Sequence, residues 1–583
     1  MTPIVRHRSH SPLVAALVRA RAWPNAYDLA AFALLIAAAA ALAHGAADLR
    51  EPLAGLTQQP VSLRIANLPE YALRTTLRMF AAMLASLLFT FVVATWAAKS
   101  RRAERVIVPA LDILQSVPVL GFLSFTVTFF LGLFPGRQLG AECAAVFAIF
   151  TSQAWNMTFS FYQSLRTVPR DLDEVSRGFG LSAWQRFWRL DAPFAAPGLV
   201  WNMMMSMSGG WFFVVASEAI TVGDTTLELP GIGSYLALAI AHKNIAAVAW
   251  AVAAMALLIA LYDQLLFRPI VAWADKFRVE QTAGQQRPAS WVYDMARRTR
   301  LLKRALRPIA WLWQRAMLLR LRKRAIAAAS ERATATDWGD RLWLALTLAV
   351  AAWGGWFAFD YGRQTLSLDD VAEAFGGGLA TLVRVAVLIA IASAIWVPVG
   401  VWIGLRPQLA QRVQPLAQFL AAFPANVLFP VAVIAIMRTG ANPNLWLSPL
   451  MVLGTQWYIL FNVIAGASAY PTDLREAATV YRLRSWTWWR RAILPGVFPY
   501  YVTGALTASG GSWNASIVAE LVHWGDQRVE AYGLGAYIAR ATQAGDFHRV
   551  VLGVAVMSLF VTLFNRIVWR PLYAYAERRL RLD

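Results

Sequence analysis

Residues 473–499 read "DLREAATVYRLRSWTWWRRAILPGVFP", a basic and aromatic stretch set between long apolar runs. A segment with this many arginines is not expected to cross a bilayer, because a charge in the hydrocarbon region is costly. It should therefore lie on one side of a membrane and contact something there. A related stretch, "VPRDLDEVSRGFGLSAWQRFWRLDAPFAAPG", occupies residues 168–198.

The composition indicates an integral membrane protein. Of the 583 residues, 58% are hydrophobic and only 15% are charged, against roughly a quarter in soluble domains. The single cysteine, Cys143, lies in an apolar run, so an internal disulfide is excluded and a packing role is expected. The basic N-terminus leads into an apolar stretch of membrane-spanning length without a clear cleavage site, which predicts a retained first helix.

Apolar runs of about twenty residues predict two sets of six membrane spans. The first set is 26–46, 71–97, 107–134, 140–166, 198–221 and 245–268, and the second is 340–360, 375–403, 414–438, 445–468, 500–522 and 546–569. The N-terminus, the loop "AAKSRRAER" and the segment after the sixth span are rich in Arg. Positive loops face the cytoplasm, so both termini are predicted there.

The two sets are copies of one another. Pairs separated by 302 residues are Pro169 and Pro471, Glu174 and Glu476, Trp184 and Trp486, Pro193 and Pro495, and "GIGSYL" (231–236) and "GLGAYI" (533–538). Upstream, Arg78 and Pro118 match Arg384 and Pro424 at a separation of 306. An even number of spans in each copy predicts parallel repeats, with one half at 1–278 and the other at 340–583.

The segment between them, 279–339, has a different composition. Its Arg and Lys residues alternate with Leu and Trp at helical spacing, interrupted by Pro308. We interpret it as a cytoplasmic linker that lies on anionic lipid headgroups, with docking to a cytoplasmic partner as the alternative. Nucleic-acid binding is disfavoured, because membrane topology accounts for much of the positive charge.

The two basic stretches resemble the cytoplasmic loop of the permease subunits of binding-protein-dependent ABC importers, whose pattern is EAA, three residues, Gly, nine residues and I-x-L-P. The first copy has Glu174, Gly180, Leu190 and Pro193, and the second has Glu476, Ala477, Ala478, Leu494 and Pro495. The chain is most similar to the nitrate, sulfonate, taurine and bicarbonate branch. That similarity rests on "TLRMF" and "TLVRV", "VVASEAI" and "SIVAELV", the later GxGxY and the closing "RP".

The resemblance implies an all-α membrane protein, a duplicated six-helix type I importer bundle with about twelve transmembrane helices. It also implies that each loop is a coupling helix for one of two cytoplasmic ATPase copies, and that an extracytoplasmic solute-binding protein delivers the solute. The chain has no GxxxxGK[ST] loop, so ATP and Mg are expected on the partner and no cofactor or enzymatic site on this chain. The expected location is the inner membrane of a bacterium.

The two loops depart from the pattern in different ways. Val175 and Ser176 replace Ala-Ala in the first, and Arg482 replaces Gly in the second. Because Gly favours the left-handed turn that ends a helix and Arg does not, we expect the loops to turn differently and to contact the two ATPases unequally. The alternative is a pair of amphipathic helices packed on the bundle.

Charged residues within the spans predict a second site. Glu218 and Glu520 lie about twenty residues after their spans leave the cytoplasmic side, and Arg78 and Arg384 lie near the outer ends of theirs. We predict the ion pairs Arg78–Glu218 and Arg384–Glu520, or residues of an outer gate. A structural clamp, a gating or substrate role and independent contact with headgroups remain as alternatives.

The translocation path is expected between the halves, along the third and fifth spans. Trp211, Trp513 and Asn514 are candidates for facing the solute. The proline turns at Pro118 and Pro424 and the glycine pairs are further candidates, and the glycines act either in helix packing or as hinges: Gly209, Gly210, Gly510 and Gly511.

These features predict the permease of an ATP-driven importer that moves a small solute, such as nitrate, a sulfonate, taurine or bicarbonate, by alternating access. An ATP-independent channel or secondary transporter is the alternative from another class. The membrane domain of an ABC exporter or lipid transporter is the third possibility.

Overall fold

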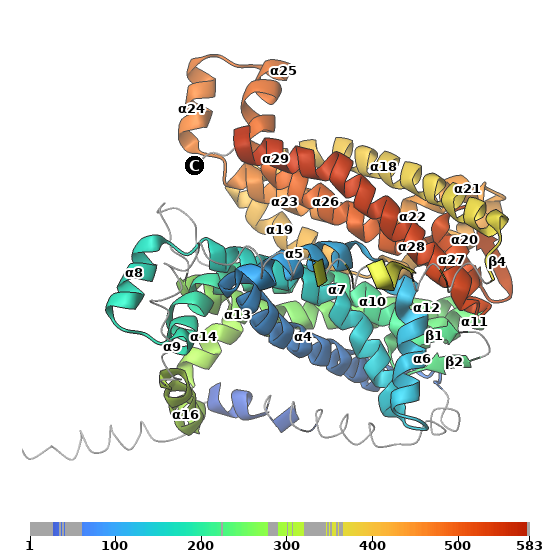
Figure 1. The fold of residues 1–583 in the computed structure, drawn as a ribbon, viewed down its shortest axis with the longest axis horizontal. Helices are drawn as coiled ribbons and strands as arrows, with labels where there is room; N and C mark the ends of the chain where they lie inside the picture. Colours follow the sequence, from blue (N-terminus) through green and yellow to red (C-terminus); the bar gives the residue numbers. More distant parts are fainter. Residues whose placement is uncertain are drawn as a thin grey trace, which may run out of the picture. The chain divides into compact units, whose positions relative to one another are not determined.

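The computed structural model describes residues 61–222, 225–277, 290–299, 301–305, 307–319 and 365–579, with short pieces within 27–40 and 345–360 (Figure 1). The first half up to its fifth long helix comprises η1 Ile65–Asn67, α4 Leu68–Lys99, α5 Arg101–Ser116, η2 Val119–Phe122, α6 Leu123–Leu133, α7 Gln138–Arg166, α8 Arg170–Gly178, α9 Ala183–Arg186, η3 Phe187–Asp191 and α10 Ala192–Glu218. It continues with β1 Ala219–Val222, β2 Thr225–Glu228, α11 Ile232–Ala241, α12 Ile245–Tyr262, η4 Asp263–Phe267, α13 Arg268–Ala274 and η5 Asp275–Phe277. The linker contributes α14 Trp291–Arg298, α15 Leu301–Ala305 and α16 Arg307–Leu318.

The second half repeats this order. It comprises α18 Leu368–Gly404, α19 Pro407–Ala422, η7 Ala425–Leu428, α20 Phe429–Thr439, α21 Pro443–Trp446, α22 Ser448–Leu453, α23 Gln456–Ser468, α24 Thr472–Val480, α25 Ser485–Trp488, η8 Trp489–Ile493 and α26 Leu494–Ala519. It ends with β3 Leu521–Trp524, β4 Gln527–Glu530, α27 Leu534–Gln543, α28 Phe547–Phe564, η9 Asn565–Trp569 and α29 Arg570–Arg579. The duplication predicted from the sequence is present in the succession of elements.

Each half also carries one short antiparallel hairpin that the all-α expectation omitted. Strands β1 and β2 pair Ala219 with Glu228, and strands β3 and β4 pair Leu521 with Glu530. Each hairpin directly follows the fifth long helix of its half. The amended fold is a helical protein with two small hairpins at equivalent positions.

Five helices of the described residues are long and apolar enough to cross a membrane: Ile65–Lys99, Ala183–Glu218, Ile245–Phe277, Leu368–Gly404 and Phe547–Ala576. Two bent pairs, Pro407–Ala422 with Ala425–Thr439 and Pro443–Leu453 with Gln456–Ser468, raise the number to seven if each pair is one span. The expected spans 26–46 and 340–360 lie mainly outside the described residues. The total of twelve and the cytoplasmic termini stay predictions.

The expected spans 107–134 and 414–438 are not single straight helices, because each is broken at the proline where a turn was expected. Pro118 and Pro424 have extended backbones and begin the short turns η2 and η7. In the second half the helices on either side of the break are bent by 76°. Proline disfavours a helical conformation in the residue before it, which explains a helix end at both positions.

Four wide π-helical turns recur in pairs, each ending two residues before a proline. Turns η3 and η8 precede Pro193 and Pro495, and turns η4 and η9 precede Pro269 and Pro571. A proline ring in a regular helix clashes with the carbonyl four residues earlier, and that carbonyl lies inside the wide turn in every case. The turns let these long helices continue through their prolines.

The described chain forms two compact units. The smaller one contains the described residues within 1–47, 167–200 and 262–333, and the larger one contains those within 48–166, 201–261 and 334–583. Because the larger unit includes residues of both halves, it contains the seam between them. The predicted domain limits at 278 and 339 rest on the duplication and stay a prediction.

The seam within the larger unit is built twice, with the roles of the halves exchanged. The Asn514 side-chain oxygen accepts a hydrogen bond from the Val119 amide at 2.8 Å, and the Asn426 side chain donates to the Phe212 carbonyl at 3.3 Å. Helix α11 packs beside β3, and α27 packs beside β1. Each half therefore holds the other through its proline turn and its hairpin, as parallel repeats around one axis require.

Helix α23 packs closely between α18 and α26 in the larger unit (Figure 1). Gly504 of α26 faces α23, and a methyl group added there would lie 2.7 Å from the Tyr458 carbonyl oxygen and 3.2 Å from the Ile459 Cα atom. Both obstructions are backbone atoms, which cannot rotate away. Small residues at such crossings permit the close approach of membrane helices.

We expect Gly504→Ala to lower the free energy of unfolding by about 1–3 kcal/mol, because α23 and α26 must separate to admit the methyl group. The measurement is the thermal unfolding midpoint of the purified protein in detergent. Gly510→Ala in the same helix is the matched control, since nothing lies within 4 Å of its added methyl group. Equal midpoints for the two variants would contradict the close packing.

Candidate functional site: buried ion pairs and exposed loops

A buried carboxylate stands at the end of α10. The Glu218 side chain is fully buried and accepts hydrogen bonds from Thr75 Oγ1 at 2.7 Å, Arg78 Nη1 at 2.8 Å and the Gly233 amide at 2.7 Å. Thr75 and Arg78 lie on α4, and Gly233 lies in the first turn of α11. The predicted partners Arg78 and Glu218 are therefore brought together, along with a third element.

The GxGxY pattern places the start of α11 against this carboxylate. A side chain at Gly231 would overlap the Glu218 carboxylate, and one at Gly233 would overlap the Val215 carbonyl. The amides at the beginning of a helix are unpaired and carry partial positive charge, so they stabilise an anion. Glycine is needed at both positions, because the backbone at the start of α11 lies directly against the Glu218 carboxylate and the α10 backbone and leaves no room for a side chain.

The second half repeats the arrangement. Glu520, which is 1% exposed, accepts hydrogen bonds from Thr381 Oγ1 at 2.8 Å, Arg384 Nη1 at 2.9 Å and the Gly535 amide at 2.8 Å. A side chain at Gly533 would overlap its carboxylate. The two predicted ion pairs thus have the same three-element surroundings.

The halves differ at one position that sequence reasoning missed. Arg78 binds Glu142 with two further hydrogen bonds of 2.6 Å, whereas Arg384 meets Asn444 at 3.1 Å in the equivalent place. The first site therefore has two carboxylates for one guanidinium, and the second has one. An acidic residue within an apolar run, "GAECAAVF", was the signal that could have identified Glu142.

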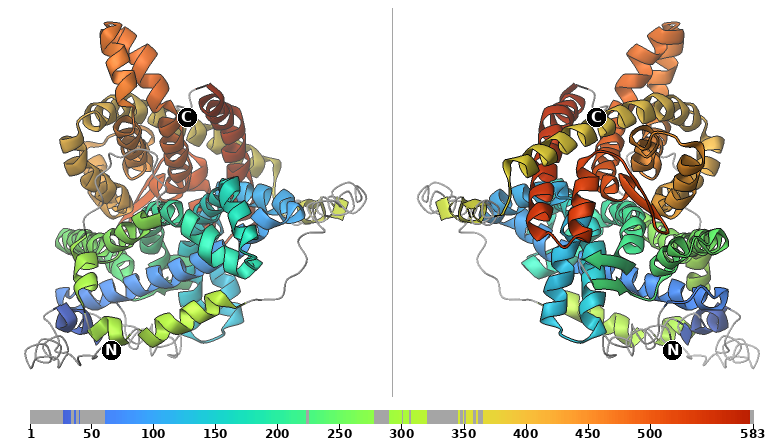
Figure 2. Two further views of the ribbon diagram at one scale, coloured as in Figure 1. Left: turned by 90° about the vertical axis from the view of Figure 1, so that its left-hand side faces the viewer. Right: turned by 90° about the vertical axis from the view of Figure 1, so that its right-hand side faces the viewer.

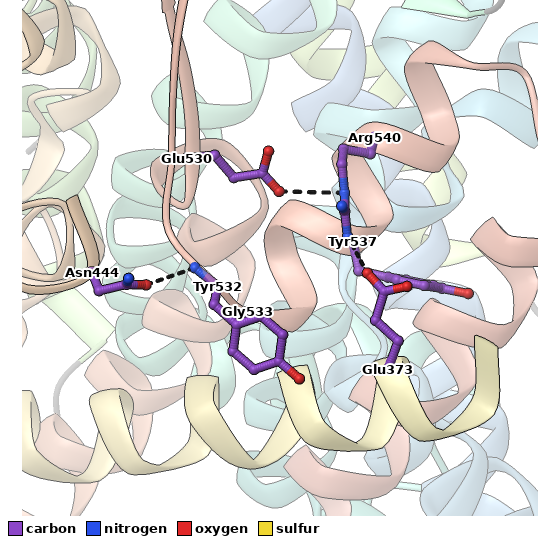
Figure 3. A pocket seen from close by; sticks show the side chains of 7 residues that line it. All are labelled: Glu373, Asn444, Glu530, Tyr532, Gly533, Tyr537 and Arg540. Carbon is purple, nitrogen blue, oxygen red and sulfur yellow. Dashed lines mark hydrogen bonds and ion pairs between the residues drawn. The ribbon is translucent and has the colours of Figure 1, made fainter. Parts of the chain in front are cut away.

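A pocket of about 340 Å³ opens beside the second ion pair. Its lining residues are Glu373, Asn444, Glu530, Tyr532, Gly533, Tyr537 and Arg540 (Figure 3). Arg540 is held between the carboxylates of Glu373 and Glu530, and Asn444 accepts from the Tyr532 amide at 2.7 Å. Burial raises the pKa of Tyr537 to about 12, so its phenol stays neutral at physiological pH. Because two carboxylates surround one guanidinium, the pocket does not present free positive charge to an anion.

The first basic loop forms a short helix and a left-handed turn. Glu174 is exposed on α8, which ends at a turn through Gly180, where φ is +62°. The Leu181 amide donates to the Ser176 carbonyl at 3.2 Å, and the Gly180 amide donates to the Arg177 carbonyl at 2.9 Å. These two bonds define a Schellman motif, the common way for a helix to end at glycine.

The second loop adopts the same turn, so the expectation that the loops turn differently is wrong. Arg482 has a φ of +50°, and its amide donates to the Thr479 carbonyl at 3.0 Å. The Leu483 amide donates to the Ala478 carbonyl at 2.9 Å. The hydrogen bonds of the turn outweigh the roughly 1–2 kcal/mol that a left-handed conformation costs a residue with a side chain.

Both loops present charge and apolar surface to the outside. Glu476 is exposed like Glu174, while Ala477 is half-buried and Ala478 is buried against the turn. Large apolar side chains beside them are 78–79% exposed: Phe179 in the first loop and Val480 and Tyr481 in the second. Helices α24 and α25 project from the other helices of the second half in both views of Figure 2. Exposed apolar surface of this kind is typical of sites that contact another protein or a membrane.

The loops continue into the long helices without a hinge loop. Pro193 and Pro495 each follow a π-helical turn that joins the short helix of the loop to α10 or α26. The helical path is therefore continuous from α9 to α10 and from α25 to α26, while the left-handed turns separate α8 and α24 from it.

The residues predicted for the path are packed inside the larger unit. Trp211 and Trp513 are each 1% exposed, so neither indole faces solvent in this structure, and Asn514 is engaged by the Val119 amide at the seam. The Trp513 indole N–H finds no hydrogen-bond partner in the part of the chain that the structure describes. The role of these residues in transport stays a prediction.

The glycine pairs differ within each pair. A methyl group added at Gly210 would lie 2.8 Å from Gln153 Nε2, and one added at Gly511 would lie 2.6 Å from Thr455 Cγ2. Gly209 has only a contact of 3.8 Å, and Gly510 has open space. Close packing therefore explains a glycine at the second position of each pair, Gly210 and Gly511. The hinge interpretation stays open for the first position, Gly209 and Gly510.

These features define a class of protein: a duplicated helical membrane component with two exposed basic loops. Two regions of the chain, residues 86–268 and 396–582, match the family described as binding-protein-dependent transport system inner membrane component. The chain belongs to this family and carries its characteristic region twice. Within the described residues there is no group of three or more His, Cys, Asp or Glu side chains that could hold a metal ion.

Curated relatives are similar over part of the chain. A bicarbonate transport system permease protein, CmpB of Synechococcus elongatus, is 31% identical over 190 residues, which is 33% of this chain and 65% of the relative. The nitrate import permease protein NrtB of Leptolyngbya laminosa is 28% identical over 189 residues, 32% of this chain and 64% of the relative. The glycine betaine/proline betaine transport system permease protein ProW of Escherichia coli is 31% identical over 158 residues, 26% and 42% respectively. The matched segments thus span less than two thirds of each relative.

We expect Glu520→Gln to destabilise the protein by about 1–2 kcal/mol more than Glu218→Gln. Removing a carboxylate leaves Arg384 with only an amide partner, whereas Arg78 keeps the carboxylate of Glu142. The measurement is the thermal unfolding midpoint of each variant in the same detergent. Glu142→Asn, which gives the first site the composition of the second, should make Glu218→Gln as costly as Glu520→Gln. A larger effect at Glu218 in the native background would overturn this electrostatic account.

We expect Arg482→Gly to stabilise the second turn by about 1 kcal/mol, because glycine adopts its left-handed conformation without strain. Amide exchange of Leu483, whose N–H closes the motif, should then slow about fivefold. Arg482→Lys is the control and should leave exchange unchanged, since lysine suffers the same backbone strain. Faster exchange in the glycine variant would show that the arginine side chain itself stabilises the turn.

Proposed function

We propose that this chain is the transmembrane permease of an ATP-driven importer, with both halves of the membrane domain in one polypeptide. The observation that carries the proposal is the pair of exposed loops, each with a surface glutamate, exposed apolar side chains and the same Schellman turn. Two equivalent loops suit two copies of one ATPase. Each loop helix would sit on one ATPase subunit, and ATP with Mg would be bound by that partner rather than by this chain.

Alternating access would be driven through the second short helix of each loop and the π-helical turn that joins it to the long helix. When the ATPase subunits close, the loops move, and the seam at Asn514–Val119 and Asn426–Phe212 shifts between two arrangements. An extracytoplasmic solute-binding protein would deliver the solute at the opposite side, in the inner membrane of a bacterium.

The substrate we propose is a small anion of the nitrate, bicarbonate or sulfonate class, with taurine among the candidates. The support comes from the relatives, whose names specify bicarbonate and nitrate transport. A buried indole N–H without an acceptor, that of Trp513, is also a group that an oxyanion would satisfy. The pocket beside Arg540 does not support anion binding in this structure.

The test is affinity purification of the tagged chain in mild detergent with a phosphate-release assay. We expect a nucleotide-hydrolysing subunit that carries a GxxxxGK[ST] sequence to co-purify, and the double variant Glu174→Lys/Glu476→Lys to lose it. The matched control is Asp171→Lys/Asp473→Lys, which reverses an exposed charge at equivalent positions in the first turns of the same helices and should retain the subunit.

The alternatives predict other outcomes. Solute flux through the purified chain in vesicles without any ATPase would establish a channel or secondary transporter. ATP-dependent movement of solute out of the cytoplasmic compartment, independent of a solute-binding protein, would establish an exporter.

A further inference from the structure

The linker helix α16 rests on the first loop inside the smaller unit (Figure 1). Trp184 Nε1 donates to the Ala316 carbonyl at 2.7 Å, and Gln185 Nε2 donates to the Leu318 carbonyl at 2.9 Å. The Trp188 and Trp313 rings pack edge to face with centroids 5.1 Å apart. Carbonyls in the last turn of a helix lack hydrogen-bond partners in their own helix. The Trp184 and Gln185 side chains supply these partners and so cap the C-terminal end of α16.

The first loop is also tied internally. Arg186 of α9 pairs with Asp173 of α8 and lies 3.4 Å from Asp191 of η3. Ser182 and Gln185 form a reciprocal capping box at the start of α9. These bonds join α8, α9 and η3, so that a force on α16 acts on the whole loop.

The second loop has a different chemistry at the same positions. Arg475, Trp488 and Ile493 stand where Asp173, Arg186 and Asp191 stand in the first loop, so they cannot form those ion pairs. The counterpart of Trp184, the Trp486 side chain, is 69% exposed. The two loops thus share a turn but differ in what supports them.

The rest of α16 exposes an apolar stripe. Trp311, Leu312 and Leu318 lie on the sides of α16 that face away from Trp313 and are 50%, 61% and 44% exposed. An uncovered stripe of this kind is unfavourable in water, so it requires a partner.

Two arginines lie among these apolar residues, on the same side of the helix. Arg307, Trp311 and Arg315 follow one another at four-residue intervals, and the Arg315 guanidinium lies 4.1 Å from the Trp311 ring centroid. Residues 295–319 contain seven Arg and Lys residues and no Asp or Glu. A helix with adjacent apolar, aromatic and basic faces and no acidic residue is complementary to an anionic bilayer surface.

We propose that α16 is a lipid-dependent brace on the first loop only. Anionic headgroups hold the basic and apolar face of α16, and α16 in turn holds Trp184, Gln185 and Trp188. Resting on the proposed function, the brace makes coupling through the first ATPase contact depend on anionic lipid, while the second loop is independent of it.

The test compares the full chain in nanodiscs of phosphatidylcholine with nanodiscs containing about 30% phosphatidylglycerol. Hydrogen exchange followed by mass spectrometry should slow at least threefold in residues 182–188 and 309–318 when phosphatidylglycerol is present, with no change in 484–490. Arg307→Gln/Arg315→Gln should abolish the effect of the lipid. Trp184→Phe, which keeps a ring but loses the donor, should abolish it in 182–188 only, and Trp486→Phe should have no effect.

Equal slowing in both loops, or no slowing in 182–188, would overturn the brace. Exchange requires no ATPase, so its outcome is separate from that of the proposed function. Where the ATPase co-purifies, ATP hydrolysis should rise at least twofold with phosphatidylglycerol in the native chain and stay constant in Arg307→Gln/Arg315→Gln. If no ATPase co-purifies in the affinity experiment but the exchange effect is present, the brace stands and the proposed function fails.

Discussion

The burial of one carboxylate per half is the constraint on which the larger unit depends. Glu218 and Glu520 end their long helices in the protein interior, where an unpaired charge would be prohibitively costly. Each carboxylate therefore needs an arginine from the first long helix and backbone amides from the helix after the hairpin. Three elements far apart in sequence must meet at one point, and the glycines that allow this contact have no substitute with a side chain. The requirement fixes where each hairpin begins and how the following helix approaches.

The two copies have the same geometry at this site but differ in the side chains around it. The second carboxylate of the first site, Glu142, corresponds to Asn444, so the first site carries an excess negative charge and the second is balanced. The turns show the same relationship, because Gly180 and Arg482 have the same left-handed conformation although only one of them favours it. The hydrogen bonds within each arrangement therefore determine the backbone, and a single unfavourable residue is tolerated where the surrounding bonds are complete.

Sequence reasoning reached what periodicity and charge determine. The duplication, the ion pairs and the exposed loops follow from spacing. The pairing of Arg78 with Glu218 could be inferred because the two residues lie at the same depth of two different apolar helices. The hairpins and the turn at Arg482 could not be inferred, since each depends on competition between a local preference and contacts that form only after folding, whereas the turns at Pro118 and Pro424 were expected from the prolines. Glu142 was missed for a different reason: its signal was present in an apolar run but had no obvious partner until the helices were packed.

The connections between the loops, the long helices and the seam suggest how two halves with the same succession of elements could act together. In each half a π-helical turn joins the second short helix of the loop to the long helix that ends at the buried carboxylate. There the carboxylate is bonded to two other elements, which must move with it or release it. Hydrogen bonds of Asn514 and Asn426 also connect the two halves within the larger unit. These bonds would resist a displacement of one half relative to the other. Under the proposed brace, the first loop is held by α16 through Trp184 and Gln185, whereas Trp486 in the second loop is 69% exposed, so the two loops would respond differently to the same ATPase movement.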